Sequence, residues 1–455
     1  MILEQFYLGC LAHASYVIAD EQTGEALLVD PQRDIATYEA LLQERGLRPI
    51  GVALTHFHAD FLAGHIEMRD KYHVPIYLGA AAEAEFDFTP LADGDEINVG
   101  SIVVRALSTP GHTPEGTSYV VFEHAGAQPH AVLTGDTMFI GDVGRPDLLA
   151  SVGVTSEELA GMLYRSLRDK LLKLPDETLV YPAHGAGSLC GKNLSNETVS
   201  TIGAQRRENY ALQPMSEAEF IELVTADQPE SPAYFGHDAT LNKQERDSLD
   251  EVMARTLHEL NVDATREHVA KGIKVIDVRD ADTVHRGFMR GTINIGLHGT
   301  YATWAGSLLA PGEPIVVIAE RADAEEAVMR LGRIGYDQVL GWIAWEDLSA
   351  ALSADELAQT ERVNADTVDR LREGGVGIVD VRAPKEFALG HLDEAENVPL
   401  QHLAETAADW PRDKPLLVHC AGGYRSSAAV TVLIALGFTE VYDLKGGYKA
   451  VAAAA

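Results

Sequence analysis

Cysteine is scarce in this chain of 455 residues: there are only three, Cys10, Cys190 and Cys420, far apart and in unlike contexts. Disulfide frameworks occur in short secreted chains with an even set of regularly spaced cysteines, so none is expected here. Any cysteine chemistry must involve single thiols. Because a free cysteine usually behaves as a small hydrophobe, we expect Cys10 and Cys190 to be buried or to line the mouth of a site.

Basic residues are also scarce: 36 Lys and Arg stand against 69 Asp and Glu, a formal net charge of −33. So acidic a chain repels the phosphates of nucleic acids and anionic lipids, and neither is an expected partner. No stretch approaches the roughly 20 apolar residues of a membrane span, and residues 1–7 do not resemble a signal peptide. We therefore expect a cytoplasmic protein with small-molecule partners. The oligomeric state stays open, a homo-oligomer included.

The length exceeds what one hydrophobic core supports and predicts about two to four domains. In the first part of the chain, short β-rich runs are interrupted by helical patterns such as residues 36–45, which is typical of an α/β layered domain. The charged stretch 197–258 is interpreted as helices that close this domain, followed by a linker. The predicted strands cover residues 16–19, 26–29, 52–54, 74–78, 102–104, 118–122, 131–133 and 179–181.

Beyond residue 260 the chain repeats itself. Residues 275–279 (Val-Ile-Asp-Val-Arg) match residues 378–382 (Ile-Val-Asp-Val-Arg), and similar matches follow at nearly the same offset. Such self-similarity predicts two copies of one small α/β domain. The copies differ at a chemically important position, because Cys420 of the second copy aligns with Ala319 of the first. The predicted domains are therefore residues 1–255, 260–352 and 360–455.

Polar motifs follow four of the predicted strands. In the first motif, alternation along the strand end aims His56, His58 and Asp60 in one direction. Because imidazole and carboxylate groups from separate loops suit a borderline divalent ion, the sequence predicts a metal site. Ligand type alone leaves both zinc and Fe(II) open. The other three motifs contribute His112, Asp136 and His184.

These motifs resemble those of the metallo-β-lactamase superfamily, an αββα sandwich, and the resemblance covers about residues 1–250. In that superfamily, binuclear hydrolases of the glyoxalase II type carry a further histidine immediately after the aspartate of the first motif. Here Phe61 follows Asp60. The departure argues against a tightly held second metal. A zinc-dependent thioester hydrolase of glyoxalase II type, with an appended sulfurtransferase, is kept as the alternative function.

The longer strings at residues 134–147 and 181–192 resemble persulfide dioxygenases, the sulfur-dioxygenase branch of this fold. The resemblance implies one Fe(II) per chain on His56, His112 and Asp136. Two histidines and one carboxylate leave positions open for O2 and a substrate sulfur. The groups that would orient these ligands are His58, Asp60 and His184.

Arg145 lies in the first of these strings, and the resemblance places it near the substrate entrance. There its guanidinium would hold a carboxylate of the thiol carrier. An internal ion pair with Asp142 or Asp147 explains this arginine equally well.

Cys420 follows an apolar run and opens a glycine-containing loop that leads into a predicted helix. Such a turn can point successive backbone N–H groups at one atom, while the helix N-terminus and Arg425 add positive potential. We expect a thiol in this place to exist largely as the thiolate. Phosphatases also use Cys-x4-Arg loops. With residues 378–387 upstream, however, the second repeat resembles a rhodanese domain, which implies a persulfide on Cys420. The backbone amides that would cradle it are those of Ala421, Gly422, Gly423, Tyr424 and Arg425.

The first repeat, with Ala319 in place of cysteine, resembles an inactive rhodanese domain and is expected to be a spacer or docking surface. Over its whole length the chain resembles fused persulfide dioxygenase and rhodanese proteins. The resemblance implies Fe(II)-dependent oxidation of a low-molecular-weight thiol persulfide by O2 to sulfite and thiol. Sulfur transfer through Cys420 would form or use thiosulfate. A third hypothesis is a non-catalytic sulfur carrier with a vestigial metal site.

Overall fold

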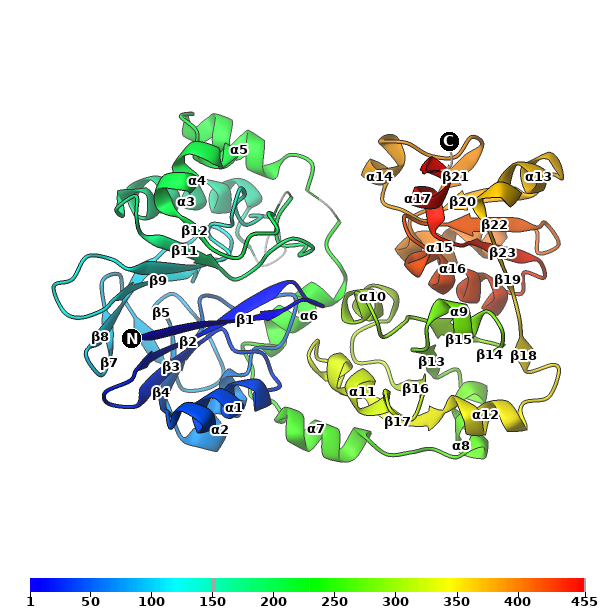
Figure 1. Cartoon of the computed structure of the whole chain (residues 1–455), viewed down its shortest axis with the longest axis horizontal. Helices are drawn as coiled ribbons and strands as arrows, with labels where there is room; N and C mark the ends of the chain where they lie inside the picture. Colours follow the sequence, from blue (N-terminus) through cyan, green and yellow to red (C-terminus); the bar gives the residue numbers. More distant parts are fainter. Residues whose placement is uncertain (149–152, 193, 229, 454–455) are drawn as a thin grey trace. The chain divides into compact units, whose positions relative to one another are not determined.

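The computed structural model describes residues 1–148, 153–192, 194–228 and 230–453. It divides into two compact units (Figure 1). The first comprises Met1–Asp250 with Arg333–Gly335, and the second Glu251–Gly332 with Tyr336–Ala455. Both contain helices and sheets, and the boundaries of the three predicted domains stay a prediction.

Two six-stranded sheets form the centre of the first unit. One has the strand order β1-β2-β3-β4-β5-β6 and the other the order β12-β11-β10-β9-β8-β7. The strands of the first sheet are β1 (Ile2–Leu8), β2 (His13–Asp20), β3 (Glu25–Val29), β4 (Arg48–Ala53), β5 (Ile76–Gly79) and β6 (Thr89–Leu91). Those of the second are β7 (Glu96–Val99), β8 (Ile102–Ser108), β9 (Thr117–Phe122), β10 (Ala131–Gly135), β11 (Leu179–Pro182) and β12 (Ser200–Thr201).

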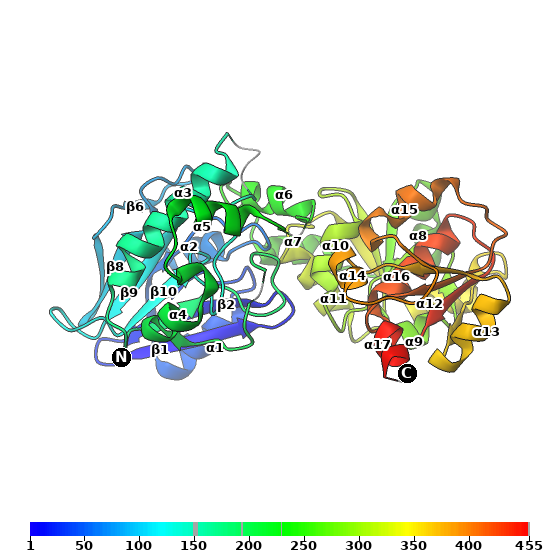
Figure 2. The ribbon, with the colours of Figure 1, turned by 90° about the horizontal axis from the view of Figure 1, so that it is seen from above.

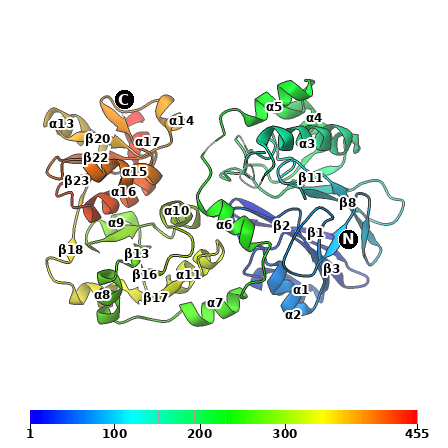
Figure 3. The same ribbon diagram turned by 180° about the vertical axis from the view of Figure 1, so that it is seen from behind.

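The two sheets pack face to face. Ile18 and Leu27 of one sheet and Val104 and Val121 of the other belong to a single buried cluster. Helices cover the outer faces: α1 and α2 lie on the side of β3 and β4, and α3, α4 and α5 on the side of β11 and β12 (Figure 1 and Figure 3). Seen from above, α3, α4 and α5 lie over the second sheet (Figure 2). The result is a four-layer αββα sandwich. The helices of this unit are α1 (Ala36–Arg45), α2 (His65–Tyr72), α3 (Ser156–Asp169), α4 (Ile202–Glu208), α5 (Glu217–Thr225) and α6 (Tyr234–Leu241). The chain passes into the second unit within α7 (Leu249–Thr256).

Local sequence fixes where the helices of the outer layer begin. At the start of α3, the Thr155 hydroxyl accepts a hydrogen bond from the Glu158 N–H, and the Glu158 carboxylate accepts one from the Thr155 N–H. Ser216 and Glu219 form the same capping box at α5. Each box satisfies two backbone donors that would otherwise have no helical partner.

The second unit contains one main sheet for each repeat. The first repeat has the strand order β15-β13-β16-β17, and the second has β19-β23-β22-β20-β21. Read from its other end, the second sheet is β21-β20-β22-β23-β19, so its first four strands match the order of the first sheet. All the pairs in these two sheets are parallel. The strands are β13 (Lys274–Asp277), β15 (Thr292–Asn294), β16 (Ile315–Ala319), β17 (Val339–Ala344), β19 (Glu361–Val363), β20 (Gly377–Asp380), β21 (Ala395–Asn397), β22 (Leu416–His419) and β23 (Val441–Leu444), and a two-stranded sheet pairs β14 (Phe288–Met289) with β18 (Leu357–Ala358).

Helices connect these parallel strands, as parallel pairing requires. In the first repeat they are α8 (Val262–Ala270), α9 (Ala281–Val284), α10 (Tyr301–Leu308), α11 (Ala324–Gly332) and α12 (Trp345–Ala351). In the second they are α13 (Val368–Glu373), α14 (Pro384–Ala388), α15 (Leu403–Thr406), α16 (Tyr424–Ala435) and α17 (Gly447–Ala452). None of the helices in the described part of the chain is long and apolar enough to cross a bilayer.

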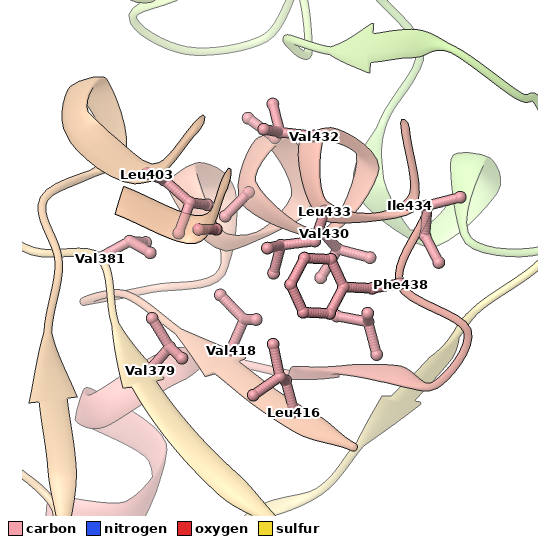
Figure 4. Packing of buried hydrophobic residues seen from close by; sticks show 14 of the residues in the cluster. Val379, Val381, Leu403, Leu416, Val418, Val430, Val432, Leu433, Ile434 and Phe438 are labelled. Carbon is pink, nitrogen blue, oxygen red and sulfur yellow. The ribbon is translucent and has the colours of Figure 1, made fainter. Parts of the chain in front are cut away.

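The core of the second repeat lies between its sheet and helix α16. Val379 and Val418 of the sheet face Val430 and Leu433 of the helix, and Phe438 closes one end of the cluster (Figure 4). Val284 and Phe288 of the first repeat belong to the same buried cluster. The two repeats therefore share hydrophobic packing.

Candidate metal centre and cysteine loop

The six predicted metal-site side chains come from four loops at strand ends of the first unit. The loop after β4 carries three of them, and the other three follow β8, β10 and β11. Each is at most 5% exposed. Two groups of three have potential ligand atoms within 4.8 Å of one another: His56, His112 and Asp136, and His58, Asp60 and His184.

Asp136 lies at the centre of this arrangement. Its Oδ2 is 3.8 Å from Nε2 of His56 and 3.5 Å from Nε2 of His112. Its Oδ1 is 3.6 Å from Nε2 of His184. Neither oxygen forms a hydrogen bond with any of the described residues. A buried carboxylate surrounded by imidazoles that do not hydrogen-bond to it is costly unless a cation lies between them.

The spacing of these atoms fits a divalent ion. Ligand atoms about 2.0–2.2 Å from a shared metal lie roughly 3–3.5 Å apart, close to the separations around Asp136. The remaining ring nitrogen of His112, Nδ1, lies 2.8 Å from the backbone carbonyl of Arg145. Because that carbonyl can only accept, Nδ1 carries the proton and Nε2 keeps its lone pair for a metal.

A similar arrangement orients His56. Its Nδ1 lies 3.0 Å from the Thr55 hydroxyl, which donates to Oδ2 of Asp30 at 2.8 Å. Oδ1 of Asp30 lies 3.1 Å from Nε2 of His58. Asp30 is thus an orienting carboxylate that was not predicted from the sequence, because it follows a different strand, β3, and belongs to no metal motif.

Burial sets the charge of the groups in the site. It lowers the pKa of His112 to about 4 and that of His56 well below its usual range, so both imidazoles are neutral. Burial also raises the pKa of Asp136 to about 6, against the opposing effect of His184. Burial alone would lower the pKa of His58, but the neighbouring charge of Asp30 outweighs it, and the pKa is raised overall.

His13 also lies in this site, and the sequence analysis did not select it. It begins β2, is 1% exposed, and its ring centroid is 5.6 Å from that of His58 and 5.6 Å from that of His184. Phe61 packs against it, with ring centroids 4.0 Å apart. The only signal in the sequence was a histidine at the start of an apolar strand, and most such residues have no special role.

The other two cysteines differ in exposure. Cys190 is buried, as expected, and its Sγ lies within 4.8 Å of ligand atoms of Asp136 and His184. Burial raises the pKa of its thiol, which is therefore protonated. Cys10 is partly exposed.

The Arg145 side chain is 1% exposed and forms a bidentate ion pair with Asp147 at 2.8 and 2.7 Å. Its Nη1 also donates to the carbonyl of Leu189 at 3.1 Å. The internal ion pair that the sequence allowed is therefore present, while a contact of Arg145 with a carrier carboxylate stays a prediction.

A small hollow of about 10 Å³, room for roughly one water molecule, opens beside His112. Phe57, Leu148 and Phe235 contribute most of the large side chains of its wall, and Phe235 comes from α6. An apolar wall beside a metal site keeps water away from the reacting end of a substrate.

In the second repeat, Cys420 follows β22 and precedes α16, as predicted. The Gly423 N–H donates to Sγ of Cys420 at 3.1 Å, and Gly423 adopts φ +98°, a conformation that glycine tolerates best. Cys420 is 1% exposed. Ser426, whose hydroxyl lies 3.7 Å from Sγ, was not selected from the sequence. The roles of the other predicted cradle amides stay predictions.

Arg425 forms a bidentate ion pair with Glu386 at 2.6 and 2.8 Å. This pairing fixes the guanidinium beside the cysteine loop. Asp380 and Arg382 also form an ion pair at 2.6 Å, and Arg382 donates to the carbonyl of Gly390. They tie the end of β20 to a neighbouring loop.

Comparisons with known proteins agree with this geometry. The model of the metallo-beta-lactamase superfamily matches residues 8–184, and the rhodanese-like domain model matches residues 364–454. An uncharacterized protein of Mycobacterium leprae is 34% identical over 239 residues, which are 47% of this chain and 99% of the relative. Persulfide dioxygenase ETHE1, mitochondrial, of Homo sapiens is 30% identical over 230 residues, 49% of this chain and 80% of the relative.

Among solved structures, the metallo-beta-lactamase from Staphylococcus aureus subsp. aureus COL matches with a TM-score of 0.67 and 32% identity. The match covers 75% of this chain and 98% of that one. The metallo-β-lactamase and persulfide dioxygenase resemblances, the rhodanese resemblance of the second repeat and the α/β fold class are thereby confirmed. The resemblance of the first repeat to an inactive rhodanese domain stays a prediction. The chain belongs to the metallo-β-lactamase superfamily, has a persulfide dioxygenase among its relatives, and carries a rhodanese-like domain after its αββα unit.

Proposed function

We propose that the first unit oxidises a low-molecular-weight thiol persulfide with O2, using one Fe(II) per chain, and that the rhodanese-like domain transfers sulfane sulfur through Cys420. The products of the oxidation are sulfite and the free thiol. One persulfide, one O2 and one water balance this reaction. The proposal draws on the persulfide dioxygenase relative and on the arrangement around Asp136.

His56, His112 and Asp136 would hold the iron. When bound, a ferrous ion would supply open coordination positions for the substrate sulfur and O2 and the electrons that activate O2. The protein keeps both imidazoles neutral and fixes their orientation through Thr55 and the Arg145 carbonyl. In this proposal His58, Asp60 and His184 hold the surrounding groups in place and do not bind the iron.

The small hollow beside His112 would receive the terminal sulfur of the persulfide, with the body of the thiol carrier outside it. Its apolar wall excludes water from the reacting sulfur and leaves the polar contacts of the carrier to the rim. Next to His58, Phe61 and His13 fill the space with packed rings.

In the second repeat, the Cys420 thiolate attacks the outer sulfur of thiosulfate. The S–S bond of thiosulfate breaks, sulfite leaves with the electron pair, and the outer sulfur remains on Cys420 as a persulfide. A thiolate acceptor then takes this sulfur by the same displacement. In reverse, the reactions capture sulfite as thiosulfate. The Gly423 N–H stabilises the charged sulfur at each stage.

The observation that carries the proposal is the buried Asp136 carboxylate, which three imidazole nitrogens approach without hydrogen bonds. Anaerobic purification followed by elemental analysis, with sulfite formation from glutathione persulfide, tests it. We expect iron and O2-dependent sulfite. Zinc as the only active metal, or no sulfite from the iron-loaded protein, would overturn it.

One observation keeps the zinc thioester hydrolase as a second candidate: His58, Asp60 and His184 also converge within 4.8 Å. A second ion there would create the binuclear site that hydrolysis of a thioester uses. Two metals per chain together with hydrolysis of S-lactoylglutathione would favour this candidate.

A further inference from the structure

The first repeat lacks the catalytic cysteine, yet it contacts the helix that begins at the cysteine loop of the second repeat. Three side chains of α16 make hydrogen bonds to the first repeat: Tyr424, Ser427 and Thr431. They are spaced three and four residues apart, so they lie on one face of the helix. Val284 and Phe288 of the first repeat extend the same contact into the hydrophobic core.

Tyr424 makes the contact nearest to the cysteine. It is the first residue of α16 and directly follows Gly423, whose N–H donates to Sγ of Cys420. The Tyr424 hydroxyl donates to the backbone carbonyl of Gly296 at 2.6 Å. Its ring lies against Gly299, where a Cβ would be only 2.7 Å from Cε2 of Tyr424. The loop of the first repeat therefore has a glycine where the tyrosine ring needs space.

That loop is itself held rigidly. The buried guanidinium of Arg330, on α11, donates to the carbonyls of Leu297 and Gly299 at 2.6 and 2.9 Å. Arg330 also stacks over the ring of Tyr301, at 5.4 Å from the ring centroid. The Gly296 carbonyl that accepts the Tyr424 hydrogen bond thus belongs to a loop that is held in place by other residues of the first repeat.

The next turns of α16 are bonded to Asn294, at the end of β15. Ser427 donates to Oδ1 of Asn294 at 2.5 Å, and the Asn294 N–H donates to the Thr431 hydroxyl at 2.9 Å. Asn294 in turn donates to the carbonyls of Asp277 and Arg279. The first repeat therefore sets both the position and the rotation of α16.

We propose that the first repeat is a working part of the sulfur-transfer site, and that Tyr424 is the positioning residue that holds the cysteine loop against it. The N-terminus of α16 and the Gly423 N–H stabilise negative charge on Cys420 only while they point at its sulfur. The Tyr424–Gly296 hydrogen bond holds them in that direction. This proposal rests on the proposed sulfur-transfer function, and it gives the first repeat a role beyond that of a spacer.

The test compares the full chain with its Tyr424→Phe variant. Tyr442→Phe is the matched control, because that hydroxyl, outside the cysteine loop, contacts Glu440 of its own repeat. Two readouts are followed: kcat for thiosulfate-to-thiol sulfur transfer, and the rate of Cys420 alkylation by iodoacetamide at neutral pH, measured by peptide mass spectrometry. Since one hydrogen bond contributes about 0.5–1.5 kcal/mol, we expect Tyr424→Phe to lower both by roughly three- to tenfold.

Tyr442→Phe should change neither readout, and O2-dependent sulfite formation should be the same in all three proteins. A folded Tyr424→Phe protein with wild-type kcat and alkylation rate would overturn the proposal, even if its thermal midpoint were lower. If the wild type itself transfers no sulfur, the proposed function fails, and the alkylation rate still decides whether Tyr424 positions the loop.

A second pair of variants tests the same contact from the other side. Gly299→Ala places a methyl group against the Tyr424 ring and should lower kcat in the wild-type background. Gly299 has a φ of +151°, so an alanine there also strains the backbone. In a Tyr424→Ala background the ring is absent, and Gly299→Ala should therefore lower kcat clearly less than in the wild-type background. Equal losses in both backgrounds would show that the alanine acts through its own backbone and would contradict the positioning role.

Discussion

The rings of His13 and Phe61 lie 4.0 Å apart, and Phe61 directly follows Asp60 in the first metal motif. Phe61 is fully buried and also packs on His58, with ring centroids 4.4 Å apart. An apolar ring therefore occupies the place next to Asp60 from which a second metal would be bound. This packing is consistent with a single ion near Asp136.

Replacing this ring tests the metal count. Phe61→His would place an imidazole beside Asp60 and His184, and we expect the protein to bind up to two zinc ions per chain where the wild type binds one. Elemental analysis after dialysis against zinc measures the change. Phe86→His is a control, because Phe86 is buried elsewhere in the unit against His65. Two ions already present in the wild type would contradict the mononuclear site.

His112→Ala removes one of the three proposed ligands. We expect loss of bound iron and at least a thousandfold fall in O2 uptake with glutathione persulfide, because two ligands hold the ion weakly. Sulfur transfer at Cys420 should be unchanged. His124→Ala, at an exposed histidine of the same unit, is the control. If His112→Ala left every activity unchanged, the metal site would be vestigial.

Asp30→Asn tests the orienting groups. The Asp30 carboxylate accepts hydrogen bonds from the Thr55 N–H and hydroxyl and approaches His58, so its loss should disorder both imidazoles. We expect iron affinity to fall about 10- to 100-fold, as found for groups that hold metal ligands. Competition with a fluorescent chelator measures this affinity. An unchanged affinity would show that Asp30 only supports the fold.

Cys420→Ser should abolish sulfur transfer between thiosulfate and a thiol, because serine carries no persulfide. O2 consumption on a preformed persulfide should continue at the wild-type rate. Loss of both activities in a folded variant would contradict separate sites.

The stability of the second unit should depend on His285. Burial lowers the pKa of this imidazole to about 4, and Ser427 lies 3.2 Å from its Nε2. Since its folded-state pKa lies below the unfolded value of about 6.5, the stabilisation is complete above pH 6.5 and is lost as the pH falls towards 4. Urea unfolding at pH 7 and pH 5 should show a smaller pH effect in His285→Asn than in the wild type. If the pH dependence of the free energy of unfolding were the same in both proteins, His285 would not be its source.

Much of this fold could be predicted because its signals are local. The eight predicted strands of the first unit correspond to β2, β3, β4, β5, β8, β9, β10 and β11, and residues 36–45 form α1. The missed strands β1, β6, β7 and β12 are short or partly exposed, so their apolar patterns are weak. The six metal-site residues could be selected together because each follows a buried strand.

The remaining features depend on contacts between distant parts of the chain. Asp30 and His13 belong to no motif and reach the metal site only through sheet packing. The pairing of Arg425 with Glu386 requires the loop after β20 to lie beside α16, and Tyr424 meets Gly296 only when the two repeats pack together. No local sequence pattern encodes such contacts.

We propose that one iron ion, bound to His56, His112 and Asp136, carries out the oxidation. The most direct test of this proposal is a titration of the metal-free protein with Fe(II) under anaerobic conditions, followed by measurement of O2 uptake on glutathione persulfide at each point. We predict a linear rise that ends at one iron per chain, with one O2 consumed for each sulfite formed. A rise that continues to two ions, or equal activity with zinc, would contradict the account.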